Sequence, residues 1–142
     1  MILLVEDNAD HEMLTIRALR KNQIANEIHV ARDGQEALDF LYAKGQYSNR
    51  AASQLPSLVL LDLKLPKIDG LEVLSEMRKV ETTKLVPVVV LTSSDEETDI
   101  VRSYQLGANS YVRKPVDFPQ FMEATRQLGL YWLVINQGPP VK

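Results

Sequence analysis

Five short apolar segments alternate along this chain with longer stretches of helical periodicity, and few folds accommodate that order. The segments are MILLV, EIHVA, SLVLLDL, VPVVVLT and NSYVRK, at residues 1–5, 27–31, 57–63, 86–92 and 109–114. Three of them are nearly continuous in Val, Leu and Ile. Such runs are typical of strands that are buried on both faces of a parallel sheet.

The stretches that follow these segments have the spacing of amphipathic helices. They are ADHEMLTIRALRKN, GQEALDFLYAKG, GLEVLSEMRKV, DEETDIVRSYQLG and a last helix from about residue 117 to residue 135. Gly45 and Gly107 are expected to stop the second and fourth helices. Strand and helix therefore alternate five times, which predicts a doubly wound α/β domain. Right-handed crossovers make that domain a three-layer sandwich.

The length of 142 residues fits one domain, which we expect to span residues 1–136 with an irregular tail at 137–142. The polar stretch at residues 45–57 is expected to be a solvated connection. A net charge of −3 argues against nucleic-acid binding, and the lack of cysteine excludes disulfides. No signal peptide or membrane-spanning run is visible, so a cytoplasmic location is expected. The first strand starts almost at Met1, so we expect the natural protein to begin a few residues earlier.

Two adjacent carboxylates, Glu6 and Asp7, directly follow the first apolar segment. Asp7 or Asn8 could simply cap the helix that begins near Ala9, because a short side-chain oxygen satisfies free amide groups there. The alternative is a charged site at the end of a buried strand. The ends of the other strands distinguish the two interpretations.

The third, fourth and fifth apolar segments also end in polar residues, namely Asp62, Thr92 and Lys114. In open α/β sheets, binding sites form at the carboxyl ends of the strands, near the point where the strand order reverses. Capping explains the first acidic pair but not polar groups at the ends of four strands. We therefore expect Glu6, Asp7, Asp62, Thr92 and Lys114 to converge at one edge of the sheet.

Three clustered carboxylates repel one another, so protons or cations must neutralise part of their charge. Mg²⁺ suits such oxygen ligands, keeps several waters and is completed by phosphate oxygens, whereas no His or Cys cluster offers a zinc site. A carboxylate can also attack a phosphoryl group and form an aspartyl phosphate. Lys114 and the Thr92 hydroxyl would bind the phosphoryl oxygens. The residues thus predict metal-assisted acceptance of a phosphoryl group.

With these residues the chain resembles the receiver domain of two-component response regulators. The motifs ILLVEDN, LLDLKLPKIDGLEVL, PVVVLTSS and GANSYVRKPVD follow in order over nearly the whole chain. The resemblance implies a flavodoxin-like fold with five parallel strands in order 2-1-3-4-5 and five surrounding helices. It also implies that Asp62 is the phosphoacceptor and that Glu6, Asp7, Asp62 and the Lys64 backbone carbonyl hold Mg²⁺.

The same resemblance assigns the switch residues. Thr92 and Lys114 would contact the phosphoryl group, a cis peptide would join Lys114 to Pro115, and Tyr111 occupies the position of the switch aromatic. Taken singly, these are an ordinary strand threonine, a surface lysine and a half-buried ring. Only their joint placement indicates a site. The long loop and the tail LGLYWLVINQGPP are similar to the small response regulators of bacterial and cyanobacterial phytochromes.

We therefore expect a single-domain response regulator that accepts a phosphoryl group from a histidine kinase, with a phytochrome as one candidate. Its output would be a partner protein or onward phosphotransfer, and its own catalysis only self-phosphotransfer and slow autodephosphorylation. A phosphohydrolase of the haloacid dehalogenase type is one rival, but it carries a second acid two residues after the nucleophile, where this chain has Lys64. A flavodoxin-like nucleotide binder is another, but it needs a Gly/Ser/Thr-rich loop in place of EDNAD.

Two surfaces are expected to bind proteins. The kinase must cover Asp62 for in-line transfer, so we expect it to contact Asp10, His11, Leu14 and Val116. The end of the last helix looks too apolar for one buried stripe. Either its last turn folds back and covers the core, or the fourth helix, fifth strand and fifth helix together form a homodimer surface. The apolar residues concerned are Phe121, Leu128, Tyr131, Trp132, Val134 and Ile135. Met13, Met77 and Met122 are expected in the core, and neither His11 nor His29 has an evident partner.

Overall fold

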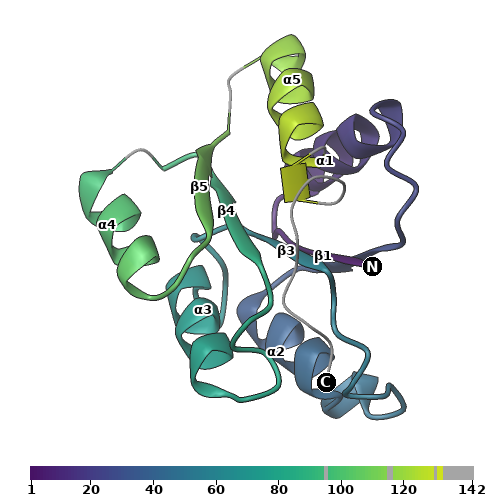
Figure 1. The fold of residues 1–142 in the computed structure, drawn as a ribbon, viewed down its shortest axis with the longest axis vertical. Coiled ribbons are helices and arrows are strands. Elements are labelled where there is room, and N and C mark those ends of the chain that lie inside the picture. The colour runs from purple at the N-terminus through teal and green to yellow at the C-terminus, as the bar shows by residue number, and fades with distance from the viewer. Residues whose placement is uncertain (95, 115–116, 130, 133–142) are drawn as a thin grey trace.

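Strands and helices alternate along the chain in the order that the apolar segments predict (Figure 1). The computed structural model describes residues 1–94, 96–114, 117–129 and 131–132. The strands are β1 Ile2–Val5, β2 Ile28–Ala31, β3 Leu58–Leu61, β4 Val88–Thr92 and β5 Ser110–Arg113. The helices are α1 Ala9–Lys21, α2 Gly34–Tyr42, α3 Gly70–Lys79, α4 Glu97–Gln105 and α5 Phe118–Gly129, with a short 3-10 turn at Gly45–Tyr47.

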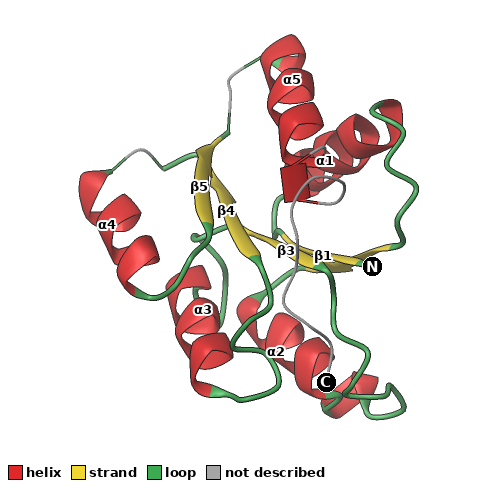
Figure 2. Ribbon diagram, in the orientation of Figure 1, coloured by secondary structure: helices red, strands yellow, loops and turns green. Residues whose placement is uncertain are grey.

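The strands form one parallel sheet in the order β2-β1-β3-β4-β5, which confirms the predicted topology. Helices α1 and α5 pack together against one face, and α2 and α3 pack together against the other (Figure 2). The chain therefore forms the three layers that right-handed crossovers require. Among the described residues, no helix is both long enough and apolar enough to cross a bilayer.

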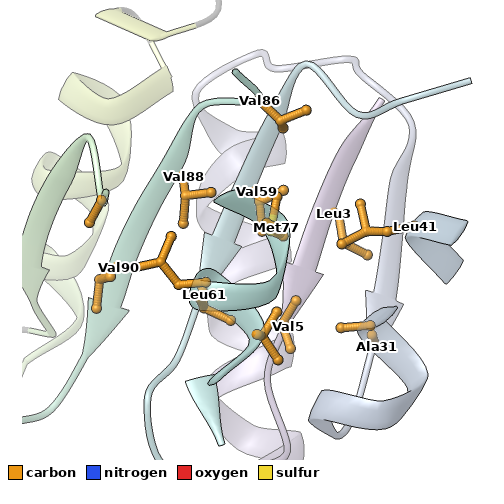
Figure 3. Close-up of a cluster of buried hydrophobic side chains, with 14 of the residues drawn as sticks. Leu3, Val5, Ala31, Leu41, Val59, Leu61, Met77, Val86, Val88 and Val90 are labelled. Atoms are coloured by element: carbon orange, nitrogen blue, oxygen red, sulfur yellow. The ribbon is translucent and has the colours of Figure 1, made fainter. Parts of the chain in front are cut away.

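Both faces of the central strands are buried, which explains why their residues are continuously apolar and do not alternate between apolar and polar. Ile2 and Leu4 face the side of α1 and α5, whereas Leu3 and Val5 face the side of α2 and α3. Because successive side chains of a strand point to opposite faces, each apolar run supplies both cores at once. The larger core continues through Val59, Leu61, Met77, Val88 and Val90 (Figure 3).

Short polar side chains start three of the helices. The Asn8 side chain accepts hydrogen bonds from the amides of Asp10 and His11 and so caps α1. Asp33 and Asp69 cap α2 and α3 in the same way. Of the two candidate caps, Asp7 and Asn8, it is therefore Asn8 that caps α1. The acidic pair before it does not serve that purpose.

Most residues of the connection at 45–57 are exposed, as predicted for a solvated loop, but Tyr47 packs against the domain. The Tyr47 hydroxyl lies 2.9 Å from Nε2 of His29 and donates a hydrogen bond of 2.6 Å to Glu36. The His29 ring also stacks on Phe40 at a centroid distance of 4.1 Å. The sequence did not identify this partner of His29, because it comes from a loop without periodicity.

Two other expectations differ from the structure. Met13 is 58% exposed, not part of the core, because it shares the outer face of α1 with the exposed residues Ala9 and Arg17. Met77 is fully buried as predicted, and Met122 packs at the margin of a smaller core cluster. Helix α2 ends at Tyr42 rather than near Gly45, because Ala43 adopts the left-handed conformation that closes the helix.

Several predictions fall on residues outside the described ranges. The described part of α5 ends at Gly129, so the predicted end of that helix near Ile135 lies outside these ranges. The cis peptide at Pro115, the docking residue Val116, the domain boundary at 136 and the tail at 137–142 also lie outside them.

Gly70 opens α3 directly behind the loop that carries Asp62, and it tests how tightly that loop is packed. A Cβ atom on Gly70 would lie 2.7 Å from the Cα of Leu63 and would also overlap the carbonyl of Asp62. Since both are backbone atoms, the loop must move, and Gly70→Ala should lower the free energy of unfolding by about 2 kcal/mol. Urea unfolding measures the change, with Glu76→Ala on the exposed face of α3 as the control. Equal stability of the two variants would contradict this packing.

Candidate functional site

The site lies at the carboxyl edge of the sheet, where the ends of four strands meet. Glu6 follows β1, Asp62 follows β3 and Lys114 follows β5, while Thr92 is the last residue of β4. Backbone hydrogen bonds hold these ends in register, from the Asp62 amide to Val5 at 3.1 Å and from the Lys114 amide to Thr92 at 2.7 Å. The parallel sheet thus delivers all four side chains to one edge, as predicted.

The ammonium group of Lys114 is the centre of the site. It forms ion pairs with Glu6 and with Oδ2 of Asp62, the latter at 3.0 Å. Its third contact is Nδ1 of His11, also at 3.0 Å. The first three of these residues are buried, with relative exposures of 7% for Lys114, 2% for Glu6 and 7% for Asp62. The last strand is therefore tied to the ends of the first and third strands by charge.

Burial and the ammonium of Lys114 act in opposite directions on the two carboxyl groups. Burial raises the pKa of Glu6 to about 7, against the lowering effect of Lys114. Burial also raises the pKa of Asp62, but Lys114 and hydrogen bonds from Thr92, Lys114 and Glu6 outweigh it, so the net change is downward. Asp62 is therefore the more acidic carboxyl group of the pair.

Three carboxylates of the site can reach one cation. Glu6, Asp7 and Asp62 each offer one oxygen, and these oxygens lie within 4.8 Å of one another. Asp7 is exposed, whereas the other two are buried. The donor set is all oxygen, which fits a hard divalent cation. The Lys64 carbonyl, the fourth predicted ligand, stays a prediction, since the contacts of this residue are made by its amide to Asp62 and by its ammonium to Asp99.

A chain of contacts leads from Asp62 to β5. Thr92 is fully buried beside Asp62, where its hydroxyl helps to lower the pKa of that carboxyl group, and its oxygen lies 3.4 Å from the amide of Ser94. The Tyr111 hydroxyl donates a hydrogen bond of 2.7 Å to the Ser94 carbonyl. The Ser94 side chain donates to Asp99 of α4 at 2.6 Å. Thr92 and Tyr111 are therefore linked through the loop after β4.

The first turn of α1 borders the site. Asp10 is exposed, Leu14 is half-buried against a small cluster that contains Phe121, and His11 reaches Lys114. Burial and the charge of Lys114 lower the pKa of His11, which favours a neutral ring. The sequence had not identified Lys114 as the partner of His11. The capping residue Asn8 gave the available signal, since it places His11 in the first helical turn beside the acidic pair.

Four polar strand ends around an acidic cluster, on a sheet of order β2-β1-β3-β4-β5, define a receiver domain. The sequence pattern of the response regulator receiver domain matches residues 2–126 of this chain. The chain belongs to this family.

The similar proteins include response regulators of phytochromes. Rcp1 of Synechocystis sp. is 40% identical over 133 residues, covering 94% of this chain and 88% of Rcp1. The crystal structure of Mn²⁺-bound Rcp1 has a TM-score of 0.89 at 38% identity and covers 98% of both chains. The phosphorylated cyanobacterial phytochrome response regulator RcpA has a TM-score of 0.90 at 40% identity, covering 98% of this chain and 97% of that one.

A relative of different description is equally similar in sequence. The probable methanogenesis regulatory protein FilR2 of Methanothrix harundinacea is 42% identical over 139 residues, covering 98% of this chain and 87% of FilR2. The chain is thus a receiver domain related to the phytochrome response regulators, with an acidic cluster that fits a divalent metal.

The stabilising effect of the Lys114 charge on the two buried carboxylates can be tested through the pH dependence of the free energy of unfolding. The pKa of Glu6 in the folded protein, about 7, exceeds its ordinary 4.5, so the folded state binds the extra proton between these values and stability falls as pH rises through this window. Lys114→Met leaves Glu6 and Asp62 without their cation. It should cost about 3 kcal/mol at pH 8 and clearly less at pH 5, where protons replace the ammonium.

Urea unfolding of the metal-free protein at both pH values measures this effect. Lys79→Met is the matched control, because Lys79 forms an exposed ion pair on α3 and its loss should cost under about 0.5 kcal/mol at either pH. A loss for Lys114→Met that is the same at pH 5 and pH 8 would show that the carboxylates do not depend on its charge.

Proposed function

We propose that this protein is a phosphorylation-dependent signalling switch that accepts a phosphoryl group on Asp62 from a histidine kinase. The observation that carries the proposal is the ionised Asp62 carboxylate, held between a buried ammonium and a buried hydroxyl. An anionic carboxylate is the nucleophile that acyl phosphate formation needs, and the two donors suit the oxygens of the arriving phosphoryl group. The likeness to the phosphorylated response regulator RcpA supports this function.

In the proposed reaction, one Asp62 oxygen attacks the phosphorus of a phosphohistidine. The new O–P bond forms as the P–N bond breaks, and the released imidazole takes up a proton. Lys114 and Thr92 would bind phosphoryl oxygens on the new aspartyl phosphate. Glu6, Asp7 and Asp62 would hold Mg²⁺, which when bound neutralises the carboxylates and the phosphoryl oxygens. In slow autodephosphorylation, a water oxygen would attack the same phosphorus, the Asp62 O–P bond would break, and inorganic phosphate would leave while the Asp62 carboxylate is restored.

Asp62→Asn should abolish phosphorylation while the fold is retained, because the amide is a poor nucleophile of nearly the same shape. Intact-protein mass spectrometry after incubation with acetyl phosphate and Mg²⁺ measures the added phosphoryl group. Asp69→Asn is the matched control, since Asp69 is exposed and asparagine also caps a helix. Undiminished labelling of Asp62→Asn would place the phosphoacceptor elsewhere.

The same assay tests the metal. Labelling of the wild type should stop in excess chelator and return with Mg²⁺, and Asp7→Ala should raise the Mg²⁺ concentration that half-saturates it. Full labelling in the presence of chelator would rule out the metal. Turnover of a phosphomonoester or a stable flavin spectrum would favour the rival functions.

We also propose that the kinase docks beside the first turn of α1, over the site edge. Asp10 and His11 are accessible there, and Leu14 and Val116 are the other expected contacts. A phosphotransfer profile against candidate histidine kinases, with phytochrome kinases first, identifies the donor. Asp10→Arg should then slow transfer from that kinase and leave labelling by acetyl phosphate unchanged.

The control for docking is Glu81→Arg, which reverses an equally exposed charge beyond the end of α3. Its transfer from the kinase should match the wild type. Equal loss of both kinase and acetyl phosphate labelling in Asp10→Arg would indicate damage to the site itself, and unchanged transfer from the kinase would remove Asp10 from the docking surface.

The output face is proposed to be α4, β5 and α5. The contacts from Thr92 through Ser94 to Tyr111 support it, since a phosphoryl group that draws the Thr92 hydroxyl toward itself must disturb the loop that also holds Tyr111. Thr92→Ala should accept phosphate but shift the NMR signals of α4 and β5 less than the wild type does, and Thr92→Ser should behave as the wild type. If Thr92→Ala shows the same NMR shifts as the wild type, Thr92 and Tyr111 are not coupled.

The same face is our proposed homodimer surface. Val101 and Tyr104 of α4 are about half exposed, as is Tyr131 just beyond the described end of α5. Trp132 instead packs partly against the core cluster of Ile2 and Leu4, so part of this apolar end does cover the domain itself. Sedimentation of the free and phosphorylated protein distinguishes a dimer from a monomer in both states.

A further inference from the structure

His11 makes a contact at the site that the phosphoryl chemistry proposed above does not use. It lies in the first turn of α1, and its Nδ1 atom is 3.0 Å from Nζ of Lys114 and 3.9 Å from Oε1 of Glu6. Its side chain is 39% exposed, so the ring lies between the buried ammonium and solvent. The contact joins a helix to a lysine from the far end of the chain.

The direction of this hydrogen bond follows from the chemistry of the two groups. An ammonium group has three N–H donors and no acceptor, and Lys114 has three partners, namely Glu6, Asp62 and His11. Nδ1 of His11 must therefore accept, which places the ring proton on Nε2. The three partners together account for all three donors of a group that burial would otherwise leave unsatisfied.

His11 differs from the other two partners in one respect. Glu6 and Asp62 belong to the acidic cluster that fits a divalent metal, and His11 does not. When the cluster holds a metal and Asp62 carries a phosphoryl group, the oxygens of both carboxylates have new partners. The uncharged Nδ1 atom is then the present acceptor that the ammonium can keep while its other protons turn to the phosphoryl oxygens.

We propose that His11 is a positioning residue that holds the Lys114 ammonium beside Asp62 while the carboxylates serve the metal and the phosphoryl group. The inference rests on the proposed function. A neutral acceptor suits this role because it anchors the ammonium without adding a fourth negative charge to three clustered carboxylates. A hydrogen bond from a charged donor is worth enough to change a rate roughly tenfold.

Two substitutions separate the acceptor from the ring. His11→Phe keeps a ring but removes the acceptor, and His11→Asn keeps an acceptor oxygen close to the position of Nδ1. Met13→Ala, on the exposed face of the same helix, is the control. With saturating Mg²⁺ and acetyl phosphate, His11→Phe should label Asp62 about tenfold more slowly than the wild type. His11→Asn should recover most of that loss, and Met13→Ala should match the wild type.

A second measurement needs neither metal nor phosphodonor. Long-range ¹H–¹⁵N spectra should show His11 of the wild type protonated on Nε2. The ammonium protons of Lys114 should exchange with water more slowly in the wild type and His11→Asn than in His11→Phe. Because His11 is partly exposed, all variants should fold, and their unfolding curves check this directly.

Each outcome bears on one of the two proposals. A wild-type labelling rate in His11→Phe, an equal loss in His11→Phe and His11→Asn, or a proton on Nδ1 would overturn the role of His11 while leaving Asp62 as phosphoacceptor. If the wild type is not labelled on Asp62, the proposed function fails instead. The tautomer and exchange measurements would then still report whether His11 holds the ammonium.

Discussion

The structure depends on one buried ammonium group that links the ends of three strands of its sheet. Lys114 follows β5, yet it pairs with Glu6 after β1 and with Asp62 after β3. Without a cation at this point, two carboxylates would lie buried side by side, an arrangement that costs several kcal/mol. The parallel sheet supplies the geometry, because its strands all end at one edge and so bring Glu6 and Lys114, 108 positions apart, into contact. Fold and site are thus consequences of the same strand order.

Much of this arrangement could be predicted from the sequence. Continuous apolar runs such as VPVVVLT are visible because strands buried on both faces have no polar side, and polar residues at their ends then identify the site edge. The contacts of His11 and His29 could not be predicted. Each is a single residue whose partner comes from a distant segment, Lys114 or Tyr47, and neither partner has a periodicity that reveals it. Met13 was misplaced for a related reason, since helical spacing gives the period of a stripe but not which stripe faces the core.

The site combines charges that would be unfavourable together in a purely structural role. Burial raises the pKa of Glu6, which means that part of the folding free energy is spent on keeping this carboxyl beside Asp62. A structural pair of this kind could be replaced by apolar side chains without loss, and often with gain. Its presence at the edge of a well-packed core is therefore best explained by chemistry, since a cation or a phosphoryl group finds there a set of ligands that is already assembled.

That assembled set also determines where a change at Asp62 can be transmitted. Toward α1 the site is bordered by His11, whose ring contacts Lys114 and Glu6. Toward α4 the contacts pass from Thr92 to Ser94, then to both Tyr111 and Asp99, and Asp99 in turn pairs with Lys64 two residues after Asp62. The loop after β4 is thus held from two sides by groups next to Asp62, the proposed phosphoacceptor. A new charge on Asp62 would act on this loop through both Thr92 and Lys64. On the α1 side, the His11 ring can keep its hydrogen bond to Lys114. The asymmetry favours α4 and β5, and not α1, as the elements that respond.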